Sequence, residues 1–515
     1  MNVHKPPFEH LMKWLSRITH LYLLIPFIIF CMGWLRLIFA LPVIALMLWA
    51  LWQSWNNAAS RAQPISARIT ISVILLTGLW IFLSGVGGYA FQNWDHHWRN
   101  AVLRDLITYK WPVIYSSPEH GSIKMLVYYV GYWLPSALVG KTFGWGAANF
   151  FLFLWTWLGV FLVTFHLSLE LKASLSKAAF LLIIFSGLDA LGTLLFVRDY
   201  PTLWPPIQHL EIWAGSLQYS AFTTQLFWVF NQAVPAWLCI ALLLESDSSL
   251  SDMQEQVPAL QIAQKFFIWS LCFFFAPLAS IGLLPYLLIE WIKRTNFKNP
   301  FKDIRFDLLF ASAMIVIISY LFFSSNTAAQ ERGFQSLAVK NFIIFFLLEG
   351  GILWLLLAPL KWRDPRWVIT GLLLIFIPFV QFGSGRDFVM RASIGPLFYL
   401  MICCGEIVFQ NITIRFYKIA IAALLIIGAL TPLYEINRSI YRTYQYYFLI
   451  DDSRRARSSS EPVAHLEQGV APELEHPNAL IADEIRTLRF MDDKLSKNFI
   501  ANVRQSLYYR YIAPR

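Results

Sequence analysis

The chain alternates between long apolar runs and short polar loops. An α-helix needs about 20 mostly apolar residues to cross a bilayer, and the runs that approach this length are 18–34, 36–54, 69–87, 146–166, 177–196, 226–244, 265–277, 280–292, 306–323, 341–360, 367–381, 394–410 and 417–434. The pattern predicts an all-α polytopic membrane protein with about 13 transmembrane helices.

The charges of the loops decide how often two ambiguous segments cross the membrane. Cytoplasmic loops are rich in Lys and Arg, and the basic loop residues here are Lys172, Lys177, Lys293, Arg294, Lys298, Lys302, Arg305, Lys361, Arg363, Arg366, Arg415 and Lys418. These loops lie on the same side of the membrane only if 265–292 crosses the bilayer twice, with a turn near Pro277, and if 122–140 does not cross it. We therefore expect a cytoplasmic N-terminus, an extracytoplasmic C-terminus and a long outer loop at 88–144.

Five arginines after the last run oppose this topology: Arg438, Arg442, Arg454, Arg455 and Arg457. Either the number of spans differs by one, or these arginines have another role. Both alternatives stay open at the level of the sequence.

Composition supports the membrane assignment. Hydrophobic residues make up 57% of the 515 residues and charged residues only 14%, whereas soluble domains carry about 25% charged residues. The net charge of +10 follows from the basic loops and requires no nucleic acid. All five cysteines lie in apolar runs, where they are expected to be buried. No small-residue cleavage site follows the first run, so we expect a retained signal-anchor helix.

The first group of unusual polar residues is "QNWDHHWRNAVLRDL" (92–106), directly after the third run. Its apolar positions recur at helical spacing, at Trp98, Val102, Leu103, Leu106 and Ile107. This predicts an amphipathic helix on the membrane surface, with Arg99, Asn100, Arg104 and Asp105 on its polar face. Asp95 would occupy the N-cap position. It could cap the helix, carry chemistry, or do both.

The second group lies in the outer loop 197–225. It combines Arg198, Asp199, His209 and Glu211 with Trp204, Trp213, Tyr219 and Trp228 just beyond it. Rings beside acids suit a carbohydrate, because sugar faces stack on rings and sugar hydroxyls need hydrogen-bond partners. An interfacial aromatic belt is the alternative, although it would not explain His209 and Glu211.

The third group is "FGSGRDFVMRASIG", with Arg386, Asp387 and Arg391 at the start of a membrane helix. Arginine binds phosphate oxygens in a bidentate manner. The alternative is an Arg386–Asp387 ion pair with Arg391 reaching the membrane surface. Asp189 and Glu349 lie inside apolar runs, where ionisable residues usually face a cavity or a partner. We expect Asp189 to line the site, with a structural ion pair as the alternative.

These features resemble those of GT-C-type glycosyltransferases. The resemblance rests on a span followed by an outer acid, a surface helix and the segment "YYVGYWLPSALVGKTFG". In addition, "QYSAFTTQLFWVFNQAVPAWL" and "GRDFVMRASIGPL" are similar to segments of an uncharacterised bacterial group of this type. The resemblance covers about 69–245 and extends to about 400. It implies extracytoplasmic juxtamembrane helices, a polyprenyl-phosphate-linked sugar as donor, and a glycan, lipid or protein as acceptor.

The resemblance also implies an inverting displacement with Asp95 as the general base. Arg386, Arg391 and Arg198 would hold the donor phosphate, Asp387 and Asp189 would line the substrate site, and His209, Glu211 and Trp213 would contact sugar. A divalent cation held by Asp95, His96 and His97 is awkward, because adjacent residues on a helix point about 100° apart; no cofactor is assigned. A polysaccharide polymerase or ligase acting on lipid-linked glycans, a transporter and an inactive homologue remain alternatives.

The expected organisation has four parts: a two-span extension (1–68), a GT-C-like module (69–245), a C-terminal bundle (246–434) and a polar C-terminal segment (435–515). The expected location is a bacterial inner membrane, with the site facing the periplasm or the exterior.

Overall fold

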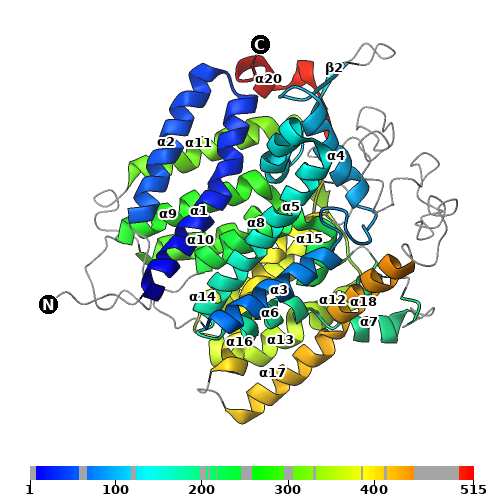
Figure 1. The fold of residues 1–515 in the computed structure, drawn as a ribbon. Helices are drawn as coiled ribbons and strands as arrows, with labels where there is room; N and C mark the ends of the chain where they lie inside the picture. Colours follow the sequence, from blue (N-terminus) through cyan, green and yellow to red (C-terminus); the bar gives the residue numbers. More distant parts are fainter. Residues whose placement is uncertain are drawn as a thin grey trace.

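The computed structural model describes residues 7–56, 66–116, 123–197, 204–206, 209–215, 217–244, 258–294, 305–326, 328, 332–383, 387–410, 414–445 and 498–514. Within these ranges the protein is a bundle of tilted helices with two small sheets (Figure 1).

Each of the thirteen apolar runs is largely helical. The corresponding elements are α1 (Pro7–Trp34), α2 (Leu37–Asn56), α3 (Ala67–Leu83), α5 (Leu134–Glu170), α6 (Leu175–Ile184), α7 (Asp189–Phe196), α8 (Phe222–Leu244), α9 (Pro258–Phe275), α10 (Pro277–Arg294), α11 (Phe306–Phe323), α12 (Val339–Phe346), the π-helix η4 (Leu347–Gly351), α13 (Ile352–Lys361), α14 (Pro365–Phe376), the 3-10 turn η5 (Ile377–Phe379), α15 (Asp387–Ala392), α16 (Ile394–Phe409), α17 (Arg415–Gly428) and α18 (Leu430–Tyr444).

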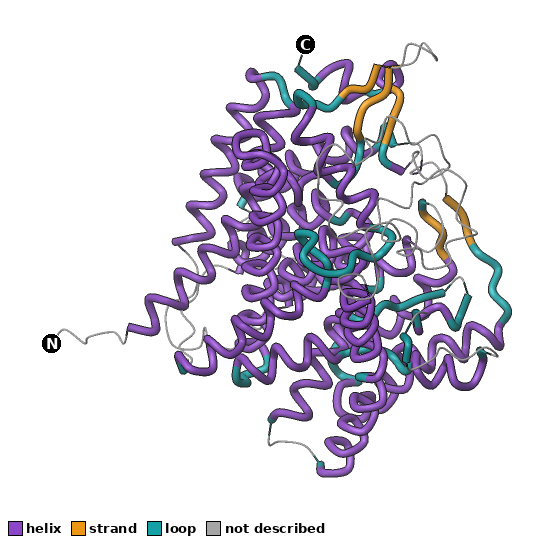
Figure 2. Tube along the Cα trace, turned by 45° about the vertical axis from the view of Figure 1, so that its right-hand side comes forward, coloured by secondary structure: helices purple, strands orange, loops and turns teal. Residues whose placement is uncertain are grey.

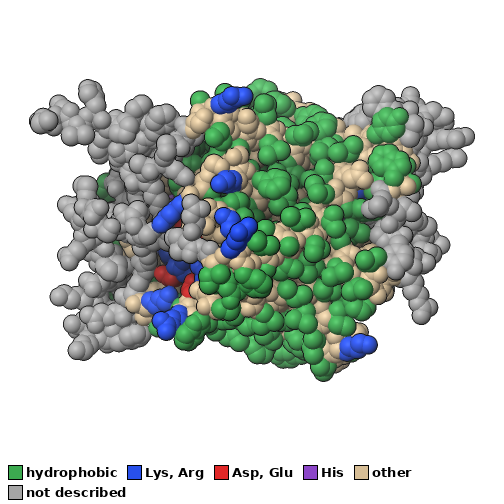
Figure 3. Space-filling model, turned by 90° about the horizontal axis from the view of Figure 1, so that it is seen from below, with side chains coloured by type: hydrophobic (Ala, Val, Ile, Leu, Met, Phe, Trp, Pro, Cys, Tyr) green, Lys and Arg blue, Asp and Glu red, His purple; other side chains and the backbone are tan. Residues whose placement is uncertain are grey.

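In the described part of the chain, nine helical stretches are long and apolar enough to cross a membrane. The chain is therefore an integral membrane protein built from α-helices. The expected count of thirteen spans is not confirmed, because Ala67–Leu83, Leu260–Phe275 and Pro365–Phe379 are shorter apolar helices. Large hydrophobic side chains cover much of the outer surface (Figure 3).

The ambiguous region 265–292 forms two helices, as the loop charges predicted. α9 ends at Phe275 and α10 begins at Pro277, so the chain turns at Ala276 and the two helices pack against each other. Proline at the start of α10 suits this break, because its missing N–H is not needed in a first helical turn.

The region 122–140 is not part of one straight span. It forms strand β2 (Ile123–Leu126), the 3-10 turn η1 (Val130–Trp133) and the first turns of α5. Gly144 then interrupts α5 with a φ of 84°, a conformation open to glycine because it has no Cβ. The remainder of α5 coincides with the predicted run 146–166.

Several basic loops gather at one end of the bundle. A polar pocket there is lined by Lys172 after α5, by Lys361 at the end of α13, by Arg366 in the first turn of α14, and by Glu406 near the end of α16. The ion pairs Lys361–Glu406 and Arg366–Glu290, both at 2.6 Å, join these segments. The grouping agrees with the expectation that these loops share one side.

Short strands add to the expected all-α fold. The strands β1 (Ile114–Ser116), β2 and β5 (Ile500–Asn502) form an antiparallel sheet with β2 in the centre, and β3 (Arg332–Phe334) pairs with β4 (Val380–Phe382). Both sheets lie on the same side of the bundle (Figure 2).

The end of the chain is built into the fold and is not only appended to it. Tyr508, in α20 (Leu507–Tyr511), donates to the carbonyl of Trp34 at 2.6 Å, and Arg36 donates through Nε to the carbonyl of Ala513 at 3.0 Å. Two of the arginines that opposed the topology, Arg438 and Arg442, are buried in α18. Arg438 has a structural role, which is described below.

Candidate functional site

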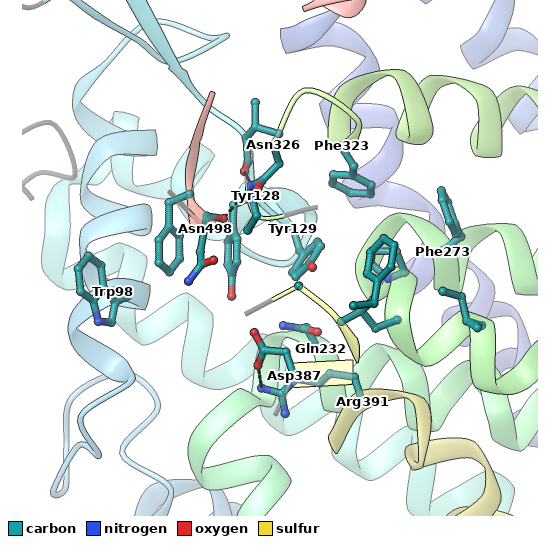
Figure 4. Close-up of a pocket in the computed structure, with 18 of the residues that line it drawn as sticks. Trp98, Tyr128, Tyr129, Gln232, Phe273, Phe323, Asn326, Asp387, Arg391 and Asn498 are labelled. Atoms are coloured by element: carbon teal, nitrogen blue, oxygen red, sulfur yellow. Dashed lines mark hydrogen bonds and ion pairs between the residues drawn. The ribbon is translucent and has the colours of Figure 1, made fainter. Parts of the chain in front are cut away.

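A cavity of about 610 Å³ lies where α4 (His96–Thr108), α8, α10, α11 and α15 approach one another. Its walls also include the segment after β2 and the residues just before β5. Figure 4 shows side chains from these segments pointing into a common space. Of the residues expected at the site, Asp95, Asp387 and Arg391 line this cavity.

Asp95 is paired with Arg99 and does not cap its helix. It precedes α4, but its side chain makes no capping hydrogen bond. Its Oδ2 instead accepts from Nη2 of Arg99 at 3.1 Å, and Nε of Arg99 donates to Oδ1 of Asn231 at 3.1 Å. The side chain of Asp95 is 27% exposed, whereas that of Arg99 is 6% exposed. Arg99 therefore fixes the carboxylate at the cavity wall, and the capping interpretation is wrong.

The expected polar face of this helix is also mostly buried. Arg99, Asn100 and Asp105 are buried, whereas Arg104 is partly exposed. Asp105 accepts a hydrogen bond of 2.5 Å from the hydroxyl of Tyr115 in β1. The helix was expected at residues 95–107 and is found at 96–108, but it packs against protein on both faces.

A second acid–arginine pair lies across the cavity. Nη2 of Arg391 is 3.7 Å from Oδ1 of Asp387, four residues earlier in α15. The hydroxyl of Tyr128 is within electrostatic reach of both pairs. Burial raises the pKa of Tyr128, the two carboxylates raise it further, and the two arginines oppose them. Arg386 lies outside the described residues.

One end of the cavity has an aromatic wall. The ring of Phe499 stacks on Trp98 with a centroid distance of 5.3 Å and an interplanar angle of 8°. The ring centroid of Tyr128 lies 4.5 Å from that of Phe499. Asn326 joins the segments that carry these rings, because its Nδ2 donates to the carbonyls of Val127 and Asn498, both at 2.8 Å.

The opposite wall is apolar. It is formed by Phe273 at the end of α9, Leu278 and Ile281 in α10, and Tyr320 and Phe323 in α11. The cavity thus combines two acid–arginine pairs, whose arginines are buried, with stacked rings and a hydrocarbon-like surface. A ligand that fits it has a charged polar part and an apolar part.

The structure gives no support to a metal centre at Asp95. His96 is buried, with Nε2 2.9 Å from the carbonyl of Phe227 and Nδ1 3.4 Å from the side-chain nitrogen of Gln92. The side chain of His97 lies outside the described part. No group of three or more His, Cys, Asp or Glu side chains that could hold a metal ion occurs among the described residues.

The residues expected to contact sugar lie elsewhere. The His209 ring is 3.2 Å from Glu435 in α18 and 3.6 Å from Glu211. Glu211 is fully buried and accepts hydrogen bonds from the side chain of Gln218 at 2.8 Å and from the backbone N–H of Ala221 at 2.9 Å. The predicted sugar contacts of His209 and Glu211 are therefore replaced by contacts within the protein, and Arg198 lies outside the described residues.

Asp189 and Trp213 do not line the cavity. Asp189 begins α7, after a break between α6 and α7, and Glu349 lies in the π-helix η4. Nε1 of Trp213 donates to Asp189 at 3.2 Å and to Glu349 at 2.9 Å. Both carboxyl groups are buried. Asp189 was expected to line the site, with an ion pair as the alternative; it does not line this cavity, and its neighbours are a tryptophan and a second acid.

The amphipathic helix α18 holds the segment that leads to Asp95. Arg438, 1% exposed, bonds to Glu435 at 2.8 Å and also donates to Oδ1 of Asn93. Thr443 accepts from the backbone N–H of Phe91 at 2.9 Å, and Ser439 donates to the carbonyl of Leu83 at 2.5 Å. Arg438 therefore serves to position the chain two residues before Asp95.

Several cavity residues were not singled out from the sequence: Arg99, Tyr128, Gln232, Asn326, Asn498 and Phe499. A signal was present for Gln232, because two adjacent amides, Asn231 and Gln232, occur within an apolar helix. For Phe499 there was none, since its partners lie far away in the sequence.

Comparison with known proteins gives no relative for this chain. No family model matches it, and neither a curated protein nor a solved structure is significantly similar to it.

Proposed function

We propose that the protein is a membrane glycosyltransferase that moves a sugar from a polyprenyl-phosphate-linked donor to a glycan, lipid or protein acceptor. The observation that carries the proposal is the single cavity that Asp95 and Arg391 share with stacked aromatic rings and an apolar wall. A lipid-linked sugar phosphate has the same three chemical parts: hydroxyl-bearing rings, an anion and a hydrocarbon chain.

In the proposed reaction the acceptor hydroxyl attacks the anomeric carbon of the donor sugar. Asp95 accepts the proton of that hydroxyl as general base, and Arg99 keeps the carboxylate facing the cavity. The bond between the anomeric carbon and the phosphate oxygen breaks, and Arg391 stabilises the negative charge that grows on the leaving phosphate. Attack opposite to the leaving group inverts the anomeric configuration.

The location of the reaction follows from the proposed topology. With the basic loops in the cytoplasm, the cavity opens on the extracytoplasmic side, which in a bacterium is the periplasm or the exterior. Phe273, Ile281 and Phe323 would then contact the first isoprene units of the carrier.

The test is the release of polyprenyl phosphate from a panel of polyprenyl-phosphate-linked sugars by purified protein in lipid nanodiscs. Asp95→Asn should lower the rate at least 100-fold and leave binding of the donor within about twofold. Asp307→Asn is the matched control, because Asp307 pairs with Arg305 and does not line the cavity. A folded Asp95→Asn protein with normal transfer would contradict the mechanism.

One observation favours the transporter alternative. Asp189 and Glu349 are buried acids at a helix break and in a π-helix, and interrupted helices with buried acids are common at ion sites in transporters. A transporter would depend on Asp189 and Glu349, whereas the transferase depends on Asp95.

A further inference from the structure

Two buried side chains at the cavity have polar atoms without a partner. Gln232 in α8 is 4% exposed, and its Oε1 makes no hydrogen bond; Arg391 in α15 is 6% exposed, and its Nε makes none. Both residues line the cavity. In Figure 4 Gln232 is drawn between Tyr129 and the Asp387–Arg391 pair. Buried polar groups in native proteins are normally satisfied, so such exceptions require an explanation.

Two other polar side chains of the cavity wall, Arg99 and Asn326, are held by hydrogen bonds within the protein. Arg99 bonds to Asp95 and Asn231. Asn326 donates to Val127 and Asn498 and accepts from the backbone N–H of Ala328. The contact between Arg391 and Asp387, at 3.7 Å, is longer than a hydrogen bond. Gln232 and Arg391 are therefore the groups with capacity for a ligand.

The chemistry of the two groups defines the ligand. The guanidinium of Arg391 is a donor only, so it requires an acceptor, and an anionic oxygen is the strongest one. The amide of Gln232 has one accepting and one donating end. A hydroxyl group both donates and accepts, so it satisfies the amide whichever end faces it. The matching ligand carries a hydroxyl group close to an anionic oxygen.

We propose that Gln232 and Arg391 form a two-point subsite that distinguishes a sugar-loaded phosphate carrier from the bare carrier. Arg391 binds a phosphate oxygen, and Gln232 binds a hydroxyl of the sugar attached to that phosphate. This inference rests on the proposed function and names a specificity-determining residue within it. After transfer the carrier keeps only the Arg391 contact, so the product binds more weakly than the substrate and leaves.

The test measures binding of two kinds of short-chain probe to the purified full-length protein: citronellyl phosphate, and its glucosyl, mannosyl and galactosyl phosphodiesters. The wild type should bind at least one phosphodiester about tenfold more tightly than citronellyl phosphate, the size of one buried hydrogen bond. Gln232→Met should abolish this difference and leave the affinity for citronellyl phosphate unchanged. Arg391→Met should weaken the binding of citronellyl phosphate and of its phosphodiesters. Gln410→Met, at the other end of the bundle, should change neither.

A second measurement separates a ligand contact from a structural one. Methionine has nearly the size of glutamine but no amide, so Gln232→Met removes an unsatisfied buried group from the empty protein. The melting temperature without ligand should rise or stay equal. A fall would mean that Gln232 has a structural partner, and this would overturn the subsite.

The remaining outcomes separate the subsite from the function. If the wild type binds neither probe, the proposed function fails as well. If it binds citronellyl phosphate and all three phosphodiesters equally, only the subsite fails. Displacement of the phosphodiester by phosphatidylglycerol at equal concentration would assign the hydroxyl and the phosphate to a membrane lipid headgroup, and would also overturn the subsite.

Discussion

Arg99 binds the carboxylate of Asp95 through Nη2 and the side chain of Asn231 through Nε, each at 3.1 Å. It therefore links the acid before α4 to the central helix α8. A planar guanidinium can make these two bonds in fixed directions, whereas the ammonium group of lysine cannot reproduce their geometry.

We expect Arg99→Met to lower the rate of sugar transfer by about 10- to 100-fold, because a carboxylate that is misplaced by a fraction of an ångström is a poor base. Donor affinity should change less than threefold. Arg99→Lys should recover part of the rate. The measurement is kcat and KM for polyprenyl phosphate release. An unchanged kcat for a folded Arg99→Met protein would show that Arg99 does not position Asp95.

The stability of the protein should depend on pH through His209. Burial lowers the pKa of His209, but Glu435 and Glu211 outweigh burial and raise it from 6.5 to about 10. The charged ring is thus favoured in the folded state. Its stabilising contribution is complete below pH 6.5, decreases above that value and is lost as the pH passes about 10.

The check is the melting temperature of the wild type and of His209→Gln at pH 6, 8 and 10. The wild type should be more stable by several degrees at pH 6, and the difference should shrink towards pH 10. Glu211, Glu435 and Arg438 are the charged groups around the ring in this cluster. A difference that is independent of pH would contradict the assignment of a charged His209.

Phe499→Ala should destabilise the protein by about 3 kcal/mol, because a ring that is 8% exposed and packs on Trp98 and Tyr128 is replaced by a void. Binding of citronellyl phosphodiesters should weaken in parallel, since the aromatic wall is lost. Leu507→Ala is the control, because this side chain belongs to the same terminal segment and is 53% exposed. It should change stability by less than about 0.5 kcal/mol. Equal effects of the two substitutions would exclude a role of the wall.

Asp189→Asn and Glu349→Gln should leave sugar transfer within about threefold of the wild type. Neither carboxyl group lines the cavity. The amide oxygen of the substituted asparagine or glutamine can still accept a hydrogen bond from Nε1 of Trp213. Sugar transfer is measured as the release of polyprenyl phosphate, as for Asp95→Asn. Solute uptake by proteoliposomes that contain each variant is measured in parallel. Loss of uptake together with intact activity of Asp95→Asn would favour the transporter.

The sequence predicted the helical segments well, because bilayer thickness imposes a length and polarity that a local window detects. The turn between α9 and α10 followed from Pro277 and from the loop charges. The placement of Asp95 beside Asp387 and Arg391 was inferred from topology, since all three were assigned to one side of the membrane.

Loop 197–225 shows where such inference fails. The composition of a loop does not reveal whether His209 meets a sugar or an acid of the same protein. Its partner Glu435 follows in α18, which the sequence assigned to a polar tail. Arg438 and Arg442 are buried in α18 and do not belong to a loop. Counting them as loop charges therefore placed the segment after the last apolar run on the cytoplasmic side, against the predicted topology. Phe499 could not be placed, because it directly precedes the three-residue strand β5, and the sequence of so short a strand does not indicate which strand it pairs with.

The docking of β5 onto β2 makes completion of the cavity wall a late event during synthesis of the chain. Trp98 and Asp95 are translated early, but the cavity wall at Asn498 and Phe499 is made only after every membrane helix described here. A nascent or prematurely terminated chain would insert its helices and still lack a closed cavity. The cavity described here therefore closes only after residues 498–502 have been made, and not when its membrane helices have inserted.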